Sequence, residues 1–256
     1  MAFKQETIED IVESEHLMIL AAPRRYGAYY AVALDVSAFL SVAVKSLDRE
    51  HEIFGRFLSQ VKNHHLLAIF AIVRLHQTQA MMNLRQVLEA GACAAFAIAN
   101  PHQDHFAKPA PGGTLDASQE LTAKRYKWLD ENFPKESSYI KATKEKINSS
   151  AAHANIVYTQ KNFRVADNGS EFIVPFFDIE DGYFEQGELL MAAGIAISLI
   201  DLFYGVNNDI NAIVWCDDFE SRFRSLFERE TALRLEMYSS DRFKEQQRKF
   251  GHLFSP

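Results

Sequence analysis

Four polar side chains that could carry chemistry recur at helical spacing between residues 74 and 89. They are Arg74, Thr78, Arg85 and Glu89. On one helix turning 100° per residue they share an azimuth. The apolar stripe beside them consists of Val73, Ala80, Leu84, Val87 and Gly91. Charged side chains at the edge of a buried stripe need partners or access to water. One interpretation is that these residues line a polar cavity inside a helical bundle. The other is that Arg85 and Glu89 form a structural i, i+4 ion pair.

A second group with catalytic potential is Lys146 followed by His153. Seven residues separate them, so on a helix they lie on nearly the same face. Small side chains between them leave the histidine approachable. An imidazole beside a cation can act as a general acid or base toward a phosphodiester. The alternative is a histidine that closes the last turn of a helix, where the helix dipole favours it.

Neutral hydrogen-bonding side chains occupy another side of the 74–89 segment. They are His76, Gln79, Asn83 and Gln86. Such a stripe could face a partner subunit or a nucleic-acid base, or it is simply the solvated face of an amphipathic helix.

The motifs that define the commonest enzyme classes are absent from the sequence. There is no P-loop, no glycine-rich dinucleotide fingerprint and no Gly-x-Ser-x-Gly elbow. His102 and His105 form a His-x-x-His pair without further ligands. Glu13 and His16 lack the second Glu-x-x-His of a di-iron bundle. The acidic segment 178–182 lacks the EF-hand glycine and predicts a strand-to-helix turn, so we expect no metal site and no cofactor.

The composition is that of an ordinary intracellular globular protein. The 256 residues are 48% hydrophobic and 24% charged, and their net charge of −7 excludes a whole-protein basic footprint for nucleic acid while leaving a local basic patch open. Cys93 and Cys216 are isolated in apolar surroundings, which predicts reduced core thiols. No signal-peptide pattern opens the chain, and charges interrupt the apolar stretches before the ~20 residues of a membrane span. We expect a cytoplasmic protein without a membrane segment.

The scarcity of turn-forming residues predicts long helices, because the chain holds only 11 glycines and 7 prolines. A capping box at Thr7 opens a short helix that ends before Pro23. A second helix is expected from about 24 to 46. The segment 48–100 is predicted to form one very long helix or two helices broken near 63–65.

The second half of the chain begins with a proline- and glycine-rich loop at 101–115. Helices are then expected at about 116–132 and 136–154. Between β-branched and aromatic runs, Asn168 and Gly169 predict a β-hairpin within 155–178, and Pro175 suggests that it contributes an edge strand.

A further helix is predicted from about Tyr183 to beyond Tyr204, and the last one begins at 217–218. On that last helix one face carries Phe219, Phe223, Leu226 and Phe227. A break at 239–241 is expected before a polar tail, 241–256. The predicted fold class is all-α: a multi-helix bundle with long core helices and one small β-hairpin insertion near 155–178, in a single domain, 1–256.

Two segments of the sequence resemble the HEPN-like helical proteins of bacterial and archaeal toxin and defence systems. The first is the Arg-x-x-x-Glu pattern of Arg85 and Glu89 on a long apolar helix, and the second is the small-residue turn that ends in His153. HEPN ribonucleases carry an arginine that is usually followed by a polar residue, then four to six further positions and a histidine. Here Lys146 takes the nearest equivalent place, with Asn148 close behind it. The resemblance implies an all-α fold and a homodimer formed through the histidine-bearing helices.

Two functions follow as hypotheses. The first is a non-catalytic HEPN-like module that binds a nucleotide, a small ligand or a partner protein, with Arg74, His76, Gln79 and Asn83 as its binding residues. The second is a metal-independent endoribonuclease. In that hypothesis His153 is the acid or base, Lys146 and Arg85 stabilise the phosphate in the transition state, and Glu89 orients Arg85.

Overall fold

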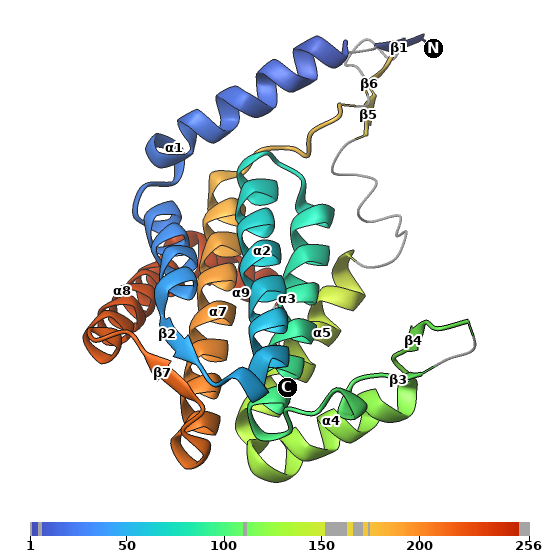
Figure 1. Cartoon of the computed structure of the whole chain (residues 1–256). Helices are drawn as coiled ribbons and strands as arrows, with labels where there is room; N and C mark the ends of the chain where they lie inside the picture. Colours follow the sequence, from blue (N-terminus) through green and yellow to red (C-terminus); the bar gives the residue numbers. More distant parts are fainter. Residues whose placement is uncertain are drawn as a thin grey trace.

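The computed structural model describes residues 2–4, 7–109, 112–151, 163–165, 171–173 and 175–250, and it is a helical bundle with short strands at its periphery (Figure 1). The predicted all-α fold class is confirmed. The helices are α1 (Ile8–Val42), α2 (Glu52–Val73), α3 (Gln77–Ala99), α4 (Gln119–Asn132), α5 (Pro134–Ala151), α7 (Gly182–Ile210), α8 (Phe219–Ser239) and α9 (Asp241–Phe250). The strands are β1 (Ala2–Lys4), β2 (Val44–Leu47), β3 (Lys108–Pro109), β4 (Leu115–Asp116), β5 (Arg164–Val165), β6 (Glu171–Ile173) and β7 (Ile213–Trp215).

The core lies where α1 and α7 pack against the hairpin formed by α2 and α3. At Gly91 of α3, an added Cβ would come within 2.5 Å of Leu199 on α7, so the absence of a side chain allows these two helices to approach closely. Helix α7 is long and apolar enough to cross a membrane, but 72% of its most apolar window is buried in the bundle. That burial is what a core helix of a globular protein requires.

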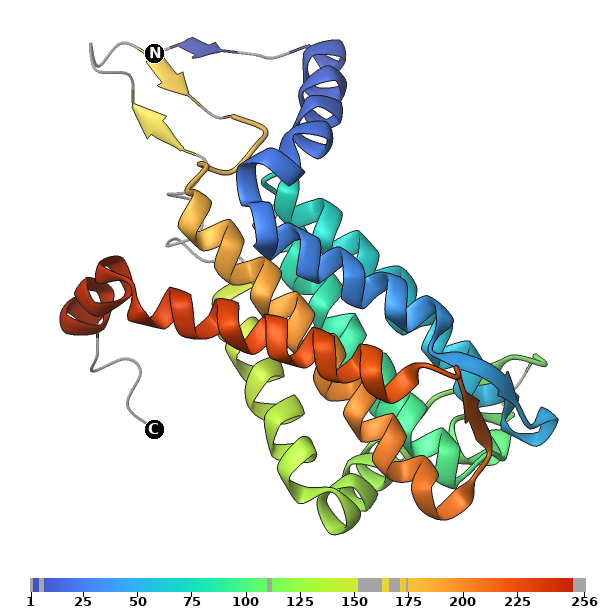
Figure 2. The same ribbon diagram turned by 90° about the vertical axis from the view of Figure 1, so that its left-hand side faces the viewer.

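Helix α8 lies across α1 and α7 on one face of the bundle, and α9 continues beyond its end (Figure 2). The predicted break at 239–241 is confirmed at Ser240, which separates the two helices. The first part of the predicted polar tail, Asp241–Phe250, forms helix α9. Charged residues with helix propensity are enough to form this short exposed helix.

Helix α1 consists of two helical segments, as predicted, but they are divided at Gly27 and not at Pro23. The φ of 52° and ψ of −125° at Gly27 are non-helical and produce a kink there. Glycine adopts positive φ without a steric penalty, whereas Pro23 lies within the first segment. The predicted capping box is present, because Thr7 accepts from the Asp10 amide and Asp10 accepts from the Thr7 amide.

The break in segment 48–100 is not near 63–65, where α2 is continuous, but at residues 74–76. His64 and His65 stay helical because each has a tertiary partner: Nδ1 of His64 donates to Asn83 at 2.9 Å, and Nε2 of His65 donates to the Ala192 carbonyl at 3.1 Å. Leu75 makes the turn instead, with φ of 59°. The azimuth shared by Arg74 and Arg85 was therefore a wrong prediction, since the two residues do not lie on one helix.

The strands form three small sheets. β5 and β6 pair antiparallel, which confirms the predicted hairpin, while its turn residues Asn168 and Gly169 lie outside the described residues. The hairpin contributes an edge strand, β5, but the strand next to Pro175 is β6, which lies in the centre between β1 and β5. The predicted loop 101–115 contains the short β3–β4 pair in its described part. β2 pairs with β7 and ties the end of α1 to the segment before α8.

Candidate functional site

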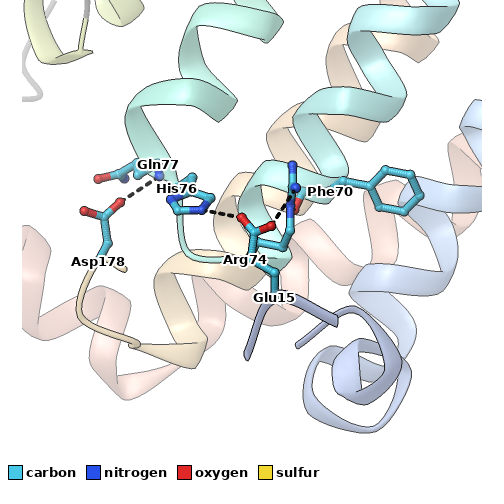
Figure 3. A network of polar contacts seen from close by, with 6 residues as sticks. All are labelled: Glu15, Phe70, Arg74, His76, Gln77 and Asp178. Atoms are coloured by element: carbon cyan, nitrogen blue, oxygen red, sulfur yellow. Dashed lines mark hydrogen bonds and ion pairs between the residues drawn. The ribbon is translucent and has the colours of Figure 1, made fainter. Parts of the chain in front are cut away.

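The turn between α2 and α3 is held by Asp178, which precedes α7 in the chain (Figure 3). The Asp178 amide donates to the Leu75 carbonyl at 2.9 Å, and its carboxylate accepts from the Gln77 amide at 2.7 Å. The local N-cap residue of α3, His76, makes no side-chain capping bond. Asp178, which is distant in sequence, therefore caps the N-terminus of α3 in place of a local N-cap residue. Its negative charge also interacts favourably with the positive end of the helix dipole.

Glu15 of α1 joins the same turn from the other side (Figure 3). Its carboxylate accepts from Nε2 of His76 at 2.9 Å and from Nη1 of Arg74 at 3.5 Å. Nε of Arg74 also donates to the Phe70 carbonyl at 3.0 Å. The structure thus brings together two of the predicted binding residues, Arg74 and His76, and engages both in anchoring α1.

Beside this turn is a cavity of about 210 Å³, which we call the acidic pocket. It is lined by Ile72, Leu75, Gln77, Asp178, Ile179, Asp181, Phe184, Glu185 and Glu188. Four of these nine residues are carboxylates, and none is Lys, Arg or His. The others are mainly apolar, so the pocket combines negative charge with walls that suit hydrocarbon.

The first turn of α7 supplies the deepest carboxylate of the acidic pocket. Asp181 caps α7 by accepting from the Tyr183 amide, and Glu185 accepts from the Asp181 amide at 3.1 Å. Glu185 is only 7% exposed. Burial raises its pKa to about 7; the hydrogen bonds from the Asp181 and Glu185 amides oppose this shift, and the nearby charges of Asp181 and Glu180 add to it. Glu185 is therefore a carboxyl group that titrates near neutral pH.

Two further contacts define the edges of the acidic pocket. The side-chain amide of Gln77 donates to the Glu188 carboxylate, which joins α3 to α7. The guanidinium of Arg242 on α9 donates to Asp181. It also lies over the rings of Tyr183 and Phe184, 4.8 and 5.4 Å from their centroids. A carboxylate and two aromatic ring faces thus already hold one cation, the Arg242 guanidinium, at the edge of the acidic pocket.

No family model, curated protein or solved structure matches the chain. The assignment of a function accordingly rests on the geometry of the described residues. Within those residues, no group of three or more His, Cys, Asp or Glu side chains is placed to hold a metal ion.

The predicted catalytic residues lie in a second place, between α3 and α5. Arg85 and Glu89 form the i, i+4 ion pair that the sequence suggested, at 3.2 Å, and Lys144 of α5 joins Glu89 at 3.0 Å. Burial alone would raise the pKa of Glu89, but the hydrogen bonds and charges of Lys144 and Arg85 outweigh it and lower that pKa. Tyr126 of α4 accepts from Lys144 at 2.9 Å and completes the cluster. Lys144 was missed in the sequence, where the resemblance pointed to its neighbours on α5.

The remaining predicted catalytic residues are only partly placed by the structure. Lys146 is exposed on α5, and the Oδ1 atom of Asn148 is buried there without a hydrogen-bond partner. Asn148 comes one helical turn after Lys144 on α5, and Arg85 comes one turn before Glu89 on α3. His153 lies outside the described residues, so its distance from this cluster is not defined.

The last two predicted binding residues do not reach the acidic pocket. Gln79 is exposed on α3. Asn83 donates to the Gln79 carbonyl at 2.9 Å and accepts from His64 of α2, so it links the two helices of the hairpin. These contacts agree with the simpler interpretation of a polar helix face.

Proposed function

We propose that the protein is a non-catalytic helical module that binds a small organic cation, with an ammonium or guanidinium group, in the acidic pocket. The observation that carries this proposal is the lining itself, with four carboxylates and no basic side chain. Carboxylates gathered in one partly buried place repel one another and are stabilised when a cation binds among them.

The charge balance around the acidic pocket supports a cationic ligand. Glu180 lies next to the lining residues and pairs with Arg25 at 3.3 Å, and Asp181 pairs with Arg242. Within the described residues, the lining of the pocket contributes Asp178, Asp181, Glu185 and Glu188 and no Lys, Arg or His. The ligand that this imbalance favours is positively charged.

The size and walls of the acidic pocket limit that ligand to a slender one. Drug-sized ligands occupy cavities of about 300–1,000 Å³, and this cavity has about 210 Å³. Ile72, Leu75, Ile179 and Phe184 offer apolar surface to a short methylene chain. An alkyl amine, an alkyl guanidine, or the side chain of a Lys or Arg from a partner protein fits both the volume and the walls.

Arg242 shows how such a cation can be held, and it also competes for the rim. Its guanidinium already uses Asp181 and the face of Phe184. Because α9 packs against α8, Arg242 is a tethered cation whose removal frees Asp181 for a ligand. We infer that Arg242 weakens binding of a free cation to the acidic pocket.

The test is a calorimetric titration with agmatine and putrescine, and with an uncharged diol of similar length as a reference. We expect saturable binding of the two cations only. Glu188→Gln should weaken it and Arg242→Gln should strengthen it, while Glu228→Gln, which changes an exposed carboxylate of α8 outside the pocket, should leave it unchanged. Absence of binding, or equal weakening by Glu228→Gln, would contradict the proposal.

The pKa of Glu185 supplies a second signature of the same site. The titratable groups around this carboxyl are Asp181 and Glu180 before α7, Arg242 on α9 and, on α1, the neutral phenol of Tyr26. Because its pKa is raised to about 7, a cation that prefers the carboxylate should bind more tightly at pH 8 than at pH 6. Glu185→Gln should remove most of that pH dependence.

A second candidate function is a metal-independent endoribonuclease of HEPN type, favoured by the meeting of Arg85, Glu89 and Lys144 between α3 and α5. In this proposal His153 is the acid or base, Lys146 and Arg85 stabilise the phosphate, and Asn148 assists. The test is RNA degradation in EDTA by the wild-type protein and by His153→Ala. Cleavage that survives chelation and disappears in the variant supports the nuclease, and cleavage equal in both excludes His153 as its catalyst.

We also propose that the protein is a cytoplasmic homodimer, as the HEPN-like resemblance and the composition imply. Apolar side chains on the first half of α1 support self-association, because Ile8, Val12 and Leu20 are each at least 60% exposed. Light scattering should report twice the chain mass for the wild-type protein and a shift toward the monomer for Val12→Asp.

A further inference from the structure

Aromatic side chains form a continuous strip where α7, β7 and the first half of α8 meet, at a place separate from the acidic pocket. Phe219, Phe223 and Phe227 follow one another at i, i+4 and i+8 on α8 and so share a face. The Phe219 and Phe223 rings are parallel within 1°, with centroids 6.0 Å apart. Tyr204 of α7 stacks on Phe219 at 5.2 Å, and Trp215 of β7 lies 4.5 Å from it.

This strip forms the floor of a groove. Two hollows of about 480 and 330 Å³ adjoin along α8 and share Tyr204, Phe219, Glu220 and Arg224 in their linings. We call the two together the aromatic groove. Phe227 is 51% exposed at its far end, and Trp215 and Phe223 are half-buried along it. Phe219 itself is buried, so the aromatic surface open to a partner is that of Tyr204, Trp215, Phe223 and Phe227.

The charges around the aromatic groove determine which partner fits it. Its lining holds the carboxylates Asp201, Asp217, Asp218 and Glu220 against a single cation, Arg224. Lys45 and Arg222 pair with Asp217 and Asp218 from outside the lining, and Asp201 lies near both Lys135 and Glu136, so these carboxylates outnumber the cations by one. That excess repels phosphate backbones and anionic membranes. It attracts Lys and Arg, which also stack favourably on aromatic faces.

We propose that the aromatic groove is a docking site for an extended, basic, proline-containing segment of a partner protein. Aromatic-lined grooves suit polyproline II segments because these are already extended and lose little entropy on binding. Such a segment has three residues per turn and rises about 3.1 Å per residue, so every third residue returns to the same face about 9 Å further on. The exposed part of the aromatic strip, at Trp215, Phe223 and Phe227, offers the surface for its prolines. Arginines between the prolines meet Asp201 and Glu220.

The experiment follows the fluorescence of Trp215, which lines the aromatic groove. Trp128→Phe removes the other tryptophan, which packs against Phe96 and Phe133. This protein is titrated with a synthetic peptide in which arginine alternates with proline and leucine. The same peptide with glutamate in place of arginine and a single-stranded oligouridine serve as references. We expect a saturable change in emission with the basic peptide alone.

Two matched pairs of variants on α8 locate the site. Phe227→Ala and Glu220→Lys alter the groove, and each should weaken peptide binding by about tenfold. Leu235→Ala and Glu228→Lys make comparable changes at exposed positions of the same helix outside the groove, and they should change the affinity less than about twofold. Equal weakening by both members of a pair would mean attraction to the net charge and would overturn the proposal. So would binding of the acidic peptide or of oligouridine, or no change in Trp215 emission.

Discussion

At the scale of single residues, two buried groups link folding to pH in opposite directions. Glu185 titrates at a pKa of about 7 because burial disfavours its charge. His65 is completely buried, and burial lowers its pKa to about 4. Nε2 of His65 donates to the Ala192 carbonyl, while its Nδ1 has no hydrogen-bond partner and is therefore kept unprotonated. Both side chains are favoured in their neutral forms by the folded state.

Glu185→Gln should stabilise the protein at high pH and not at low pH. The folded pKa lies above the ordinary value of 4.5, so the stability linked to this proton is present below about pH 4.5 and is lost as the pH rises through 7. Allowing for partial screening by solvent, the ionised carboxylate costs about 2 kcal/mol at pH 8. Urea unfolding at pH 8 and at pH 5 measures the difference. A gain of equal size at both values would mean that Glu185 is not the titrating group.

The wild-type protein should become less stable in acid because of His65, and His65→Gln should be less sensitive to acid. The folded pKa lies below the ordinary value of 6.5, so the contribution is complete above pH 6.5 and is lost as the pH falls toward 4. The full span is about 3 kcal/mol. Glutamine keeps a donor for the Ala192 carbonyl but cannot take up a proton. The readout is the change in unfolding free energy between pH 7 and pH 5, which should shrink in the variant whatever its absolute stability.

At the scale of elements, the close contact between α3 and α7 depends on one missing side chain. Gly91→Ala would place a Cβ 2.5 Å from the methyl groups of Leu199, which is 1% exposed and has little room to move. Overpacking of this kind costs about 1–3 kcal/mol, and the better helix propensity of alanine returns up to ~1 kcal/mol. We expect a lower melting temperature.

The matched control for that substitution is Gly205→Ala on α7. There an added Cβ would lie 3.6 Å from Phe133, which is ordinary van der Waals contact. It should leave the melting temperature unchanged or raise it through helix propensity. If both variants melt at the same temperature, the contact at Gly91 is looser than the structure shows.

The same scale explains which elements could be predicted from the sequence. Most helices could be located because apolar periodicity and the rare prolines and glycines define them locally. The α2–α3 turn could not, because Leu75 carries no turn signal. Its positive φ is supported by Asp178, about a hundred residues away in the chain. The division of α1 was predicted at Pro23 and lies at Gly27, because glycine adopts the positive φ that the kink requires.

The candidate site was hidden for a related reason. The sequence allowed the acidic segment 178–182 to be interpreted as a turn before a helix, and capping carboxylates are usual at such a place. The structure confirms the turn and adds that Asp178 caps α3 while Asp181 caps α7. Their convergence with Glu185 and Glu188 depends on the packing of α3 beside α7. No local pattern encodes that contact.

At the scale of the whole molecule, the two pH linkages should nearly cancel. As the pH falls from 7 to 5, protonation of Glu185 in the folded state raises the free energy of unfolding. Over the same range His65 becomes protonated in the unfolded state but stays neutral in the folded state, which lowers the free energy of unfolding. We expect an almost constant unfolding free energy in this range for the wild-type protein. Glu185→Gln alone should make stability fall with acid, and His65→Gln alone should make it rise. The double variant should be flat again, and any steep slope in it would reveal a third titrating group.

The pairing of β2 with β7 also determines when folding can finish during synthesis. Val44–Leu47 leaves the ribosome well before Ile213–Trp215, its partner. At about 5–20 residues per second, the roughly 170 residues between them take about 10 to 30 s to make. Helix α1 is likewise synthesised long before α7 and α8, which pack against it. A nascent chain of this protein therefore exposes the apolar face of α1 for most of its translation, the period in which chaperones act on unfinished chains.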